Sequence, residues 1–165
     1  MQERRLLEIL RKLEERKTHF IIVGGVAAVL NGAPVQTFDI DLVYSTSPEN
    51  IERLLSVLAS LDAVFRIQPE RRLKPTASHL SGKGHLNLLT SSGPLDLLGS
   101  VGRNLAYEDL LSHCLDMNIG EGLRVKVLDL ETLISIKEEL GSDKDIAVLP
   151  ILRQTLQEAK KRGGR

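Results

Sequence analysis

The stretch Thr37-Phe38-Asp39-Ile40-Asp41-Leu42-Val43-Tyr44 carries the most specific pattern in this sequence. Its apolar side chains at positions 38, 40 and 42 alternate with Asp39, Asp41 and Val43, and a period of two predicts a strand. Both carboxylates would then project from one face, roughly 7 Å apart at ~3.3 Å per residue. Because two such carboxylates repel each other, we expect a bridging cation, and Mg²⁺ prefers oxygen ligands of this kind. The plainer alternative is a solvent-facing strand on which two acids happen to alternate.

A third acid, Asp96, lies within the apolar run Leu95-Asp96-Leu97-Leu98, which follows the hairpin signal Ser91-Ser92-Gly93. A buried carboxylate needs either a basic partner or a metal ion, because its desolvation is costly. A nearby Arg or Lys is one solution. If this strand lies beside the Asp39-Asp41 strand, the three carboxylates instead suit two metal ions about 4 Å apart.

Two glycines, Gly24-Gly25, follow the apolar run of residues 19–23 and precede a short helical segment. A strand, two glycines and a helix leave backbone N–H groups where an anion can approach. The same glycines also make a tight turn for steric reasons alone. The run lacks the spacing G-x-G-x-x-G, so the sequence does not indicate a Rossmann dinucleotide site.

The rest of the chain alternates predicted helices and strands without a linker or repeat, which indicates a single domain over residues 1–165 of the α/β (α+β) class, with a mixed β-sheet flanked by helices. Residues 68–84 have two prolines and no clean period, and we expect a loop there. We expect helices over residues 2–17, 26–30, 48–61 (with Ser47 as the N-cap), 107–111, 131–140 and 145–161, and strands over 19–23, 37–44, 63–67, 85–89, 94–98, 112–119 and 123–128.

Composition excludes several classes of protein. The 165 residues hold 22 Lys+Arg and 22 Asp+Glu, so the chain offers no general polyanion-binding surface, although a compact phosphate site remains compatible with zero net charge. Cys114 is the one cysteine, which excludes a disulfide scaffold and a zinc finger. The longest apolar run, residues 20–30, is too short to cross a bilayer, and the charged N-terminal segment has no signal-peptide core. We therefore expect a cytoplasmic protein with no membrane partner.

Taken together, Gly24-Gly25, Asp39-Ile40-Asp41 and Leu95-Asp96-Leu97 resemble the pattern of the DNA polymerase beta-like nucleotidyltransferase superfamily. The segment from Gly32-Ala33-Pro34 to Thr37 is similar to small single-domain bacterial members, including those of toxin–antitoxin and abortive-infection systems. Lys144-Asp145 is similar to a Lys-Asp pair found late in such proteins. The resemblance covers about residues 18–150 and implies the nucleotidyltransferase fold.

The resemblance also implies an activity: transfer of a nucleoside monophosphate from an NTP to an acceptor hydroxyl, with release of pyrophosphate. Asp39 and Asp41 would bind two Mg²⁺ ions, with Mn²⁺ as a substitute, and Asp96 would hold the catalytic metal and help to activate the acceptor. The nucleotide-binding residues would be Gly24, Gly25, Thr37 and Lys83. The acceptor could be a protein, a tRNA or a small molecule, and a partner protein or a homo-oligomer is compatible with the pattern.

Three positions depart from the family pattern, which often has Ser at the place of Gly25 and basic residues near the places of Val35 and Phe38. The basic residues Arg66, Arg71, Arg72, Lys74 and Lys83 either compensate for these losses or belong to a solvated loop. His79 and His85 bracket residues 81–84, a second segment that faces substrate or simply solvent. Two other functions therefore stay open: a catalytically weak or inactive binding module of the toxin–antitoxin type, and a two-metal nuclease or phosphatase.

Overall fold

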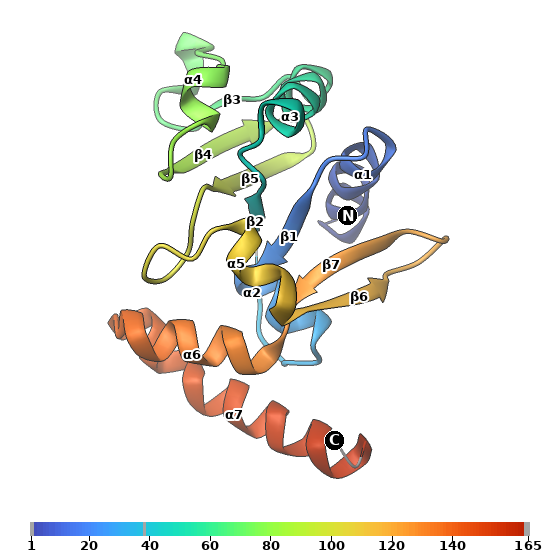
Figure 1. Ribbon diagram of the computed structural model, residues 1–165, viewed down its shortest axis with the longest axis vertical. Coiled ribbons are helices and arrows are strands. Elements are labelled where there is room, and N and C mark those ends of the chain that lie inside the picture. The colour runs from blue at the N-terminus through green and yellow to red at the C-terminus, as the bar shows by residue number, and fades with distance from the viewer. Residues whose placement is uncertain (1, 38, 164–165) are drawn as a thin grey trace.

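The computed structural model describes residues 2–37 and 39–163 and contains one seven-stranded mixed sheet (Figure 1). The strand order is β3-β4-β5-β2-β1-β7-β6. The strands are β1 (Phe20–Val23), β2 (Ile40–Tyr44), β3 (Val64–Phe65), β4 (His85–Thr90), β5 (Gly93–Leu98), β6 (Cys114–Asn118) and β7 (Arg124–Leu128). The pairs β2·β5 and β1·β7 are parallel and the other neighbours are antiparallel.

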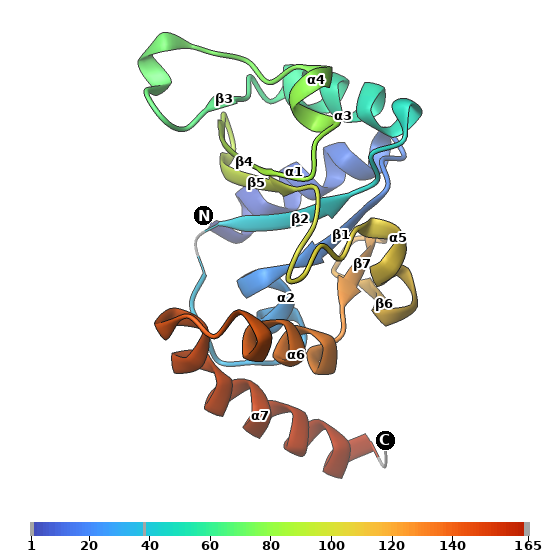
Figure 2. The ribbon, with the colours of Figure 1, turned by 60° about the vertical axis from the view of Figure 1, so that its left-hand side comes forward.

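The helical elements are α1 (Gln2–Glu15), α2 (Gly24–Leu30), α3 (Pro48–Ser60), α4 (Ala77–Leu80), α5 (Tyr107–Leu110), α6 (Leu130–Leu140), α7 (Asp143–Gly163) and the 3₁₀ turns Pro69–Arg71 and Leu111–His113. Figure 2 shows α3 and α4 beside β3 and β4 at one end of the molecule, whereas α6 and α7 lie together at the opposite end, with α2 between β1 and α6. Helices α1 and α5 lie between these two ends.

Helix α3 shows how local sequence produces these elements. The hydroxyl of Ser47 accepts a hydrogen bond from the backbone N–H of Asn50, and Pro48 occupies the first helical position, where its missing N–H costs nothing. Ile51, Leu54 and Leu58 then recur at helical spacing and are buried. Each buried apolar side chain contributes roughly 1.5–3 kcal/mol, so the buried face holds the capped helix on the sheet.

The register of the central strands places the predicted acids. Asp41 of β2 lies directly beside Asp96 of the parallel strand β5, and on its other side β2 pairs Asp41 with Val23, the last residue of β1. The neighbours of these acids along the strands, Leu42 and Leu97, point to the opposite face and are fully buried. The chain therefore turns at Gly24 immediately beside the two carboxylates.

The strand predicted from Thr37 begins only at Ile40, and Asp39 lies in the bend before it. Two tertiary features account for the difference. The neighbouring strand β1 ends at Val23, opposite Asp41, and the residue that precedes Leu95 on the other side is Pro94, which has no N–H to donate. The prediction that Phe38 points to the apolar face lies outside the described residues.

Other boundaries differ by smaller amounts. The predicted loop over residues 68–84 contains α4, which Thr76 caps by accepting from the backbone N–H of His79. The predicted strand over residues 63–67 contracts to β3, and that over 112–119 begins at Cys114 because a 3₁₀ turn precedes it. Among residues 2–37 and 39–163, no helix has both the length and the apolar character needed to cross a membrane.

Candidate active site

Asp41 and Asp96 form the centre of the candidate site. Because they occupy matching positions on adjacent parallel strands, their side chains project from the same face of the sheet. The side chain of Asp96 is only 13% exposed, and that of Asp41 is half-buried. Two carboxyl groups held side by side in a partly dry environment repel each other when both are charged.

The pKa of Asp41 rises from 3.8 to about 7 as a result. Burial is the largest cause, followed by a hydrogen bond with Asp96, the negative charge of Asp96 and that of Asp39. The positive charge of Lys137 acts in the opposite direction. A bound cation would remove the repulsion, so this arrangement favours a positive ion at the carboxylates.

The side chain of Arg66 already supplies positive charge there. Its Nη2 donates to Oδ1 of Asp96 at 2.7 Å and to the carbonyl oxygen of Leu88 at 3.0 Å. Its Nη1 lies 3.7 Å from Oδ2 of Asp39. Asp96 thus has the basic partner that its sequence context permits, and that same partner links it to Asp39.

The Arg66 guanidinium occupies carboxylate oxygens that a metal ion at this site would also need. Within the described part of the chain, no three side chains of His, Cys, Asp or Glu are arranged to hold a metal ion. The role of Arg66 was not predicted, because its sequence neighbours grouped it with the basic residues of positions 66–83. The signal available was its place within the predicted strand of residues 63–67, which puts it next to β3 (Val64–Phe65).

The two glycines make close contacts with the acidic segment. Gly24 has a φ of +67°, and a Cβ added to it would lie 2.2 Å from Oδ2 of Asp41. A Cβ on Gly25 would lie 2.6 Å from Oγ1 of Thr37, whose hydroxyl donates to the carbonyl oxygen of Asp39 at 3.3 Å. Gly24 therefore leaves room for the Asp41 carboxylate, and the hydroxyl of Thr37 fills the space that a side chain at position 25 would need.

A cavity of about 240 Å³ adjoins Asp41 and Gly24 between the sheet, residues 100–102 and α6. Its walls are largely apolar, and its polar lining residues are Asp41, His85, Ser100, Lys137 and Asp145. The Nζ of Lys137 lies 3.2 Å from Oδ1 of Asp145, so a half-buried ion pair forms part of the wall.

The adjacent residues Lys144 and Asp145 do not act as a pair in the structure. Asp145 pairs with Lys137, a residue that sequence reasoning missed, while Lys144 is exposed. Lys83 is also exposed, and its backbone carbonyl accepts from the hydroxyl of Ser100. The ring of His79 caps α4 through the backbone N–H of Thr76, whereas His85 lines the cavity.

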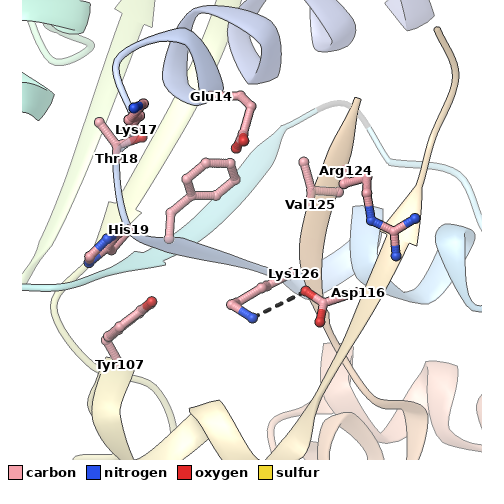
Figure 3. A pocket seen from close by; sticks show the side chains of 10 residues that line it. Glu14, Lys17, Thr18, His19, Tyr107, Asp116, Arg124, Val125 and Lys126 are labelled. Atoms are coloured by element: carbon pink, nitrogen blue, oxygen red, sulfur yellow. Dashed lines mark hydrogen bonds and ion pairs between the residues drawn. The ribbon is translucent and has the colours of Figure 1, made fainter. Parts of the chain in front are cut away.

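A second cavity of about 360 Å³ lies at the other end of β1, next to Phe20 (Figure 3). Figure 3 shows His19 and Tyr107 on one side of the cavity and Arg124 on the other. The rings of His19 and Tyr107 are nearly parallel, with their centroids 6.3 Å apart. Its carboxylates are those of Glu14 and Asp116, and Asp116 accepts from Lys126. It contains none of the predicted site residues, and the carboxylate pair of Asp41 and Asp96 is the stronger candidate for phosphate chemistry.

Comparison with solved structures identifies the fold. A provisionally assigned nucleotidyltransferase of Thermotoga maritima, TM1012, is 18% identical with a TM-score of 0.58 over 94% of this chain and 92% of that chain. The antibiotic-resistance factor ANT(2'')-Ia in solution is 17% identical with a TM-score of 0.62 over 94% and 86%. The same factor in complex with adenylyl-2''-tobramycin is 16% identical, with a TM-score of 0.60 over 94% of this chain and 89% of that chain. No family model and no curated protein sequence matches. The chain has the nucleotidyltransferase fold, as its motifs predict.

Proposed function

We propose that this chain, which has the fold of the nucleotidyltransferases, transfers a nucleoside monophosphate from an NTP to an acceptor hydroxyl and releases pyrophosphate. The observation that carries the proposal is the placement of Asp41 and Asp96 side by side on parallel strands, with Gly24 directly against them. Asp39 joins them from the bend before β2. Phosphoryl transfer depends mostly on positioning and on charge neutralisation, and this part of the sheet supplies residues for both.

The chemistry of the donor atoms suits a divalent cation. Asp39, Asp41 and Asp96 offer only carboxylate oxygens, the donors that Mg²⁺ prefers and Mn²⁺ also accepts. Burial and the neighbouring acids raise the pKa of Asp41, so a positive ion beside it would be stabilising, and the contacts of the Arg66 guanidinium with Asp39 and Asp96 support the proposal that these carboxylates accept a cation. Bound Mg²⁺ would neutralise the phosphate oxygens and the charge that develops during transfer.

The remaining roles belong to the chain's own side chains and backbone. Gly24 and Gly25 lie against Asp41 and Thr37 without side chains of their own, so in this proposal their backbone N–H groups approach the triphosphate. The hydroxyl of Thr37, which fills the space at Gly25, would take the place of the hydroxyl that Gly25 lacks. Lys137 places a positive charge on the wall of the cavity, oriented by Asp145. Lys83, on an exposed segment beside Ser100, contributes a further phosphate contact in this proposal.

A non-catalytic binding module is the second candidate, and two observations favour it. Arg66 already pairs with Asp96, and Gly25 supplies no hydroxyl for a triphosphate. Such a module would bind a nucleotide or a partner protein without consuming the nucleotide. The likeness to ANT(2'')-Ia, which has been seen with adenylyl-2''-tobramycin, favours the enzyme and a hydroxyl-bearing acceptor.

Nucleotide binding and transfer are tested together. Calorimetry measures the binding of each NTP with Mg²⁺ or with EDTA, and α-labelled NTPs are then incubated with the protein plus total tRNA, cell extract protein or an aminoglycoside panel. We expect Mg²⁺-dependent NTP binding and label transfer for the wild type, both abolished in Asp41→Asn. Asp116→Asn, an exposed carboxylate on β6, is the matched control and should retain both.

Two other outcomes are informative. Metal-dependent NTP binding without label transfer to any acceptor would favour the binding module. An absence of Mg²⁺-linked NTP binding would remove the enzymatic proposal.

A further inference from the structure

The position of Arg66 is set by the sheet. Its backbone N–H donates to the carbonyl oxygen of Asn87 at 2.9 Å, and its Nη2 donates to the carbonyl oxygen of Leu88 at 3.0 Å, so both ends of the residue are tied to β4. Because β4 pairs with β5, the guanidinium extends across the sheet face to Asp96. This arrangement gives the carboxylates a cation that belongs to the protein itself.

The hold of Arg66 on the two acids is unequal. The contact with Asp96 is a short charge-assisted hydrogen bond to a carboxylate that is 13% exposed. The contact with Asp39 is an ion pair at 3.7 Å, too long for a hydrogen bond. The Nε of Arg66 is buried and has no hydrogen-bond partner among residues 2–37 and 39–163. The guanidinium therefore has one strong contact, one weak contact and one donor without a partner among the described residues. These contacts stabilise its position, but a cation that binds the same carboxylates could displace it.

From these contacts we infer that Arg66 is a built-in competitor of the metal ion: it neutralises Asp39 and Asp96 in the metal-free protein and must leave when a divalent cation binds. The inference rests on the proposed function for the metal site. The oxygens that would hold Mg²⁺ are those that Arg66 contacts, and two positive charges at the same oxygens repel each other. The side chain of Arg66 is 32% exposed, so it can move toward solvent without crossing the core.

Metal affinity distinguishes this role from a merely structural one. If Arg66 only ordered the carboxylates, its replacement would weaken metal binding. If Arg66 competes with the metal, its replacement strengthens metal binding, because the guanidinium no longer has to be displaced. The measurement is made at about pH 8.5, well above the ordinary pKa of a carboxyl group, because protons otherwise compete with the metal for carboxylate oxygens.

The experiment titrates the wild type, Arg66→Gln, Arg66→Lys and Arg72→Gln with Mn²⁺ at about pH 8.5 and follows free Mn²⁺ by electron paramagnetic resonance. Arg72 is the matched control, because it lies on the same segment, loses the same charge and pairs with the exposed Asp62 away from the site. We expect Arg66→Gln to bind Mn²⁺ roughly tenfold more tightly than the wild type, the scale of one charge-assisted hydrogen bond. Arg66→Lys should fall between them, and Arg72→Gln should match the wild type.

A second readout reports the departure of the guanidinium directly. Titration of the wild type with Mg²⁺ should shift the NMR signal of the Arg66 Nε–H group with the same midpoint as metal binding, and leave that of Arg72 unchanged. Circular dichroism verifies that each variant is folded. If Arg66→Gln does not fold, Arg66→Lys and the NMR titration decide the question.

The outcomes separate the two proposals. Equal or weaker Mn²⁺ binding in the folded Arg66 variants, or an Arg66 signal that ignores Mg²⁺, overturns the competition while leaving the metal site in place. If none of the four proteins binds Mn²⁺ at millimolar concentration, the proposed metal-dependent function fails, and the competition fails with it.

Discussion

Replacement of Asp41 by Asn should make the metal-free protein more stable at neutral and alkaline pH. In the folded state, burial and the neighbouring acids raise the pKa of Asp41 from 3.8 to about 7. Below about pH 4, both the folded and the unfolded chain hold the proton, and its contribution to folding is complete. Between about pH 4 and pH 7 the unfolded chain releases this proton while the folded chain keeps it. The free energy of unfolding therefore falls as pH rises through this window, and becomes level above it.

The size of the effect follows from the shift. Each pKa unit corresponds to about 1.4 kcal/mol, so the change from 3.8 to about 7 corresponds to a loss on the order of 4 kcal/mol above pH 7. Asn has nearly the same shape as a protonated Asp and does not titrate. Asp41→Asn should match the wild type near pH 4 and exceed its free energy of unfolding by up to that amount at pH 8.

Urea unfolding in EDTA, monitored by circular dichroism between pH 4 and pH 8.5, measures this difference. Asp116→Asn is the control, because Asp116 is an exposed carboxylate that pairs with Lys126 on the hairpin of β6 and β7. The control should keep the pH slope of the wild type. If Asp41→Asn keeps that slope as well, the carboxyl at position 41 has an ordinary pKa in the folded protein, which contradicts the prediction.

Three further changes test packing, two of them at the candidate site and the third at the opposite end of β1. Gly24→Ala should lower the free energy of unfolding by more than about 2 kcal/mol in urea titrations and abolish Mn²⁺ binding, because its φ is +67° and its Cβ would meet Asp41; an unchanged midpoint would contradict this. Gly25→Ser should be destabilising alone but less so beside Thr37→Ala, with a coupling of about 1 kcal/mol in a double-mutant cycle, and strict additivity would show that the Thr37 hydroxyl does not occupy that space. Asn50→Ala should cost about 3 kcal/mol, since the buried amide accepts from the backbone N–H of His19 and donates to the carbonyl oxygens of His19 and Ser45; a loss below about 1 kcal/mol would contradict the network.

Local patterns predicted most of the elements. The cap at Ser47 with Pro48 located the start of α3, and the hairpin signal Ser91-Ser92-Gly93 between two apolar runs located β4 and β5. Such signals lie within a few residues of the structure that they describe. The bend at Asp39 escaped prediction because it depends on where β1 ends and on Pro94, residues distant in sequence that only the folded sheet brings alongside.

The same distinction separates the two halves of the candidate site. From the sequence, Asp39, Asp41 and Asp96 could be selected together with Gly24 and Gly25, because carboxylates in apolar strands and paired glycines are unusual in themselves. The partners of these residues were decided by tertiary structure: Arg66 reaches Asp96 across 30 positions of sequence, Thr37 lies over Gly25, and Lys137 pairs with Asp145 on the cavity wall.

Local patterns thus predicted the fold class and selected the three candidate acids, because strand periodicity and the cost of burying charge act on neighbouring residues. The shared register of Asp41 and Asp96, and the guanidinium between Asp39 and Asp96, became visible in the folded chain. Strand register and side-chain pairing are set by packing between distant segments, and no local pattern encodes which segments will meet.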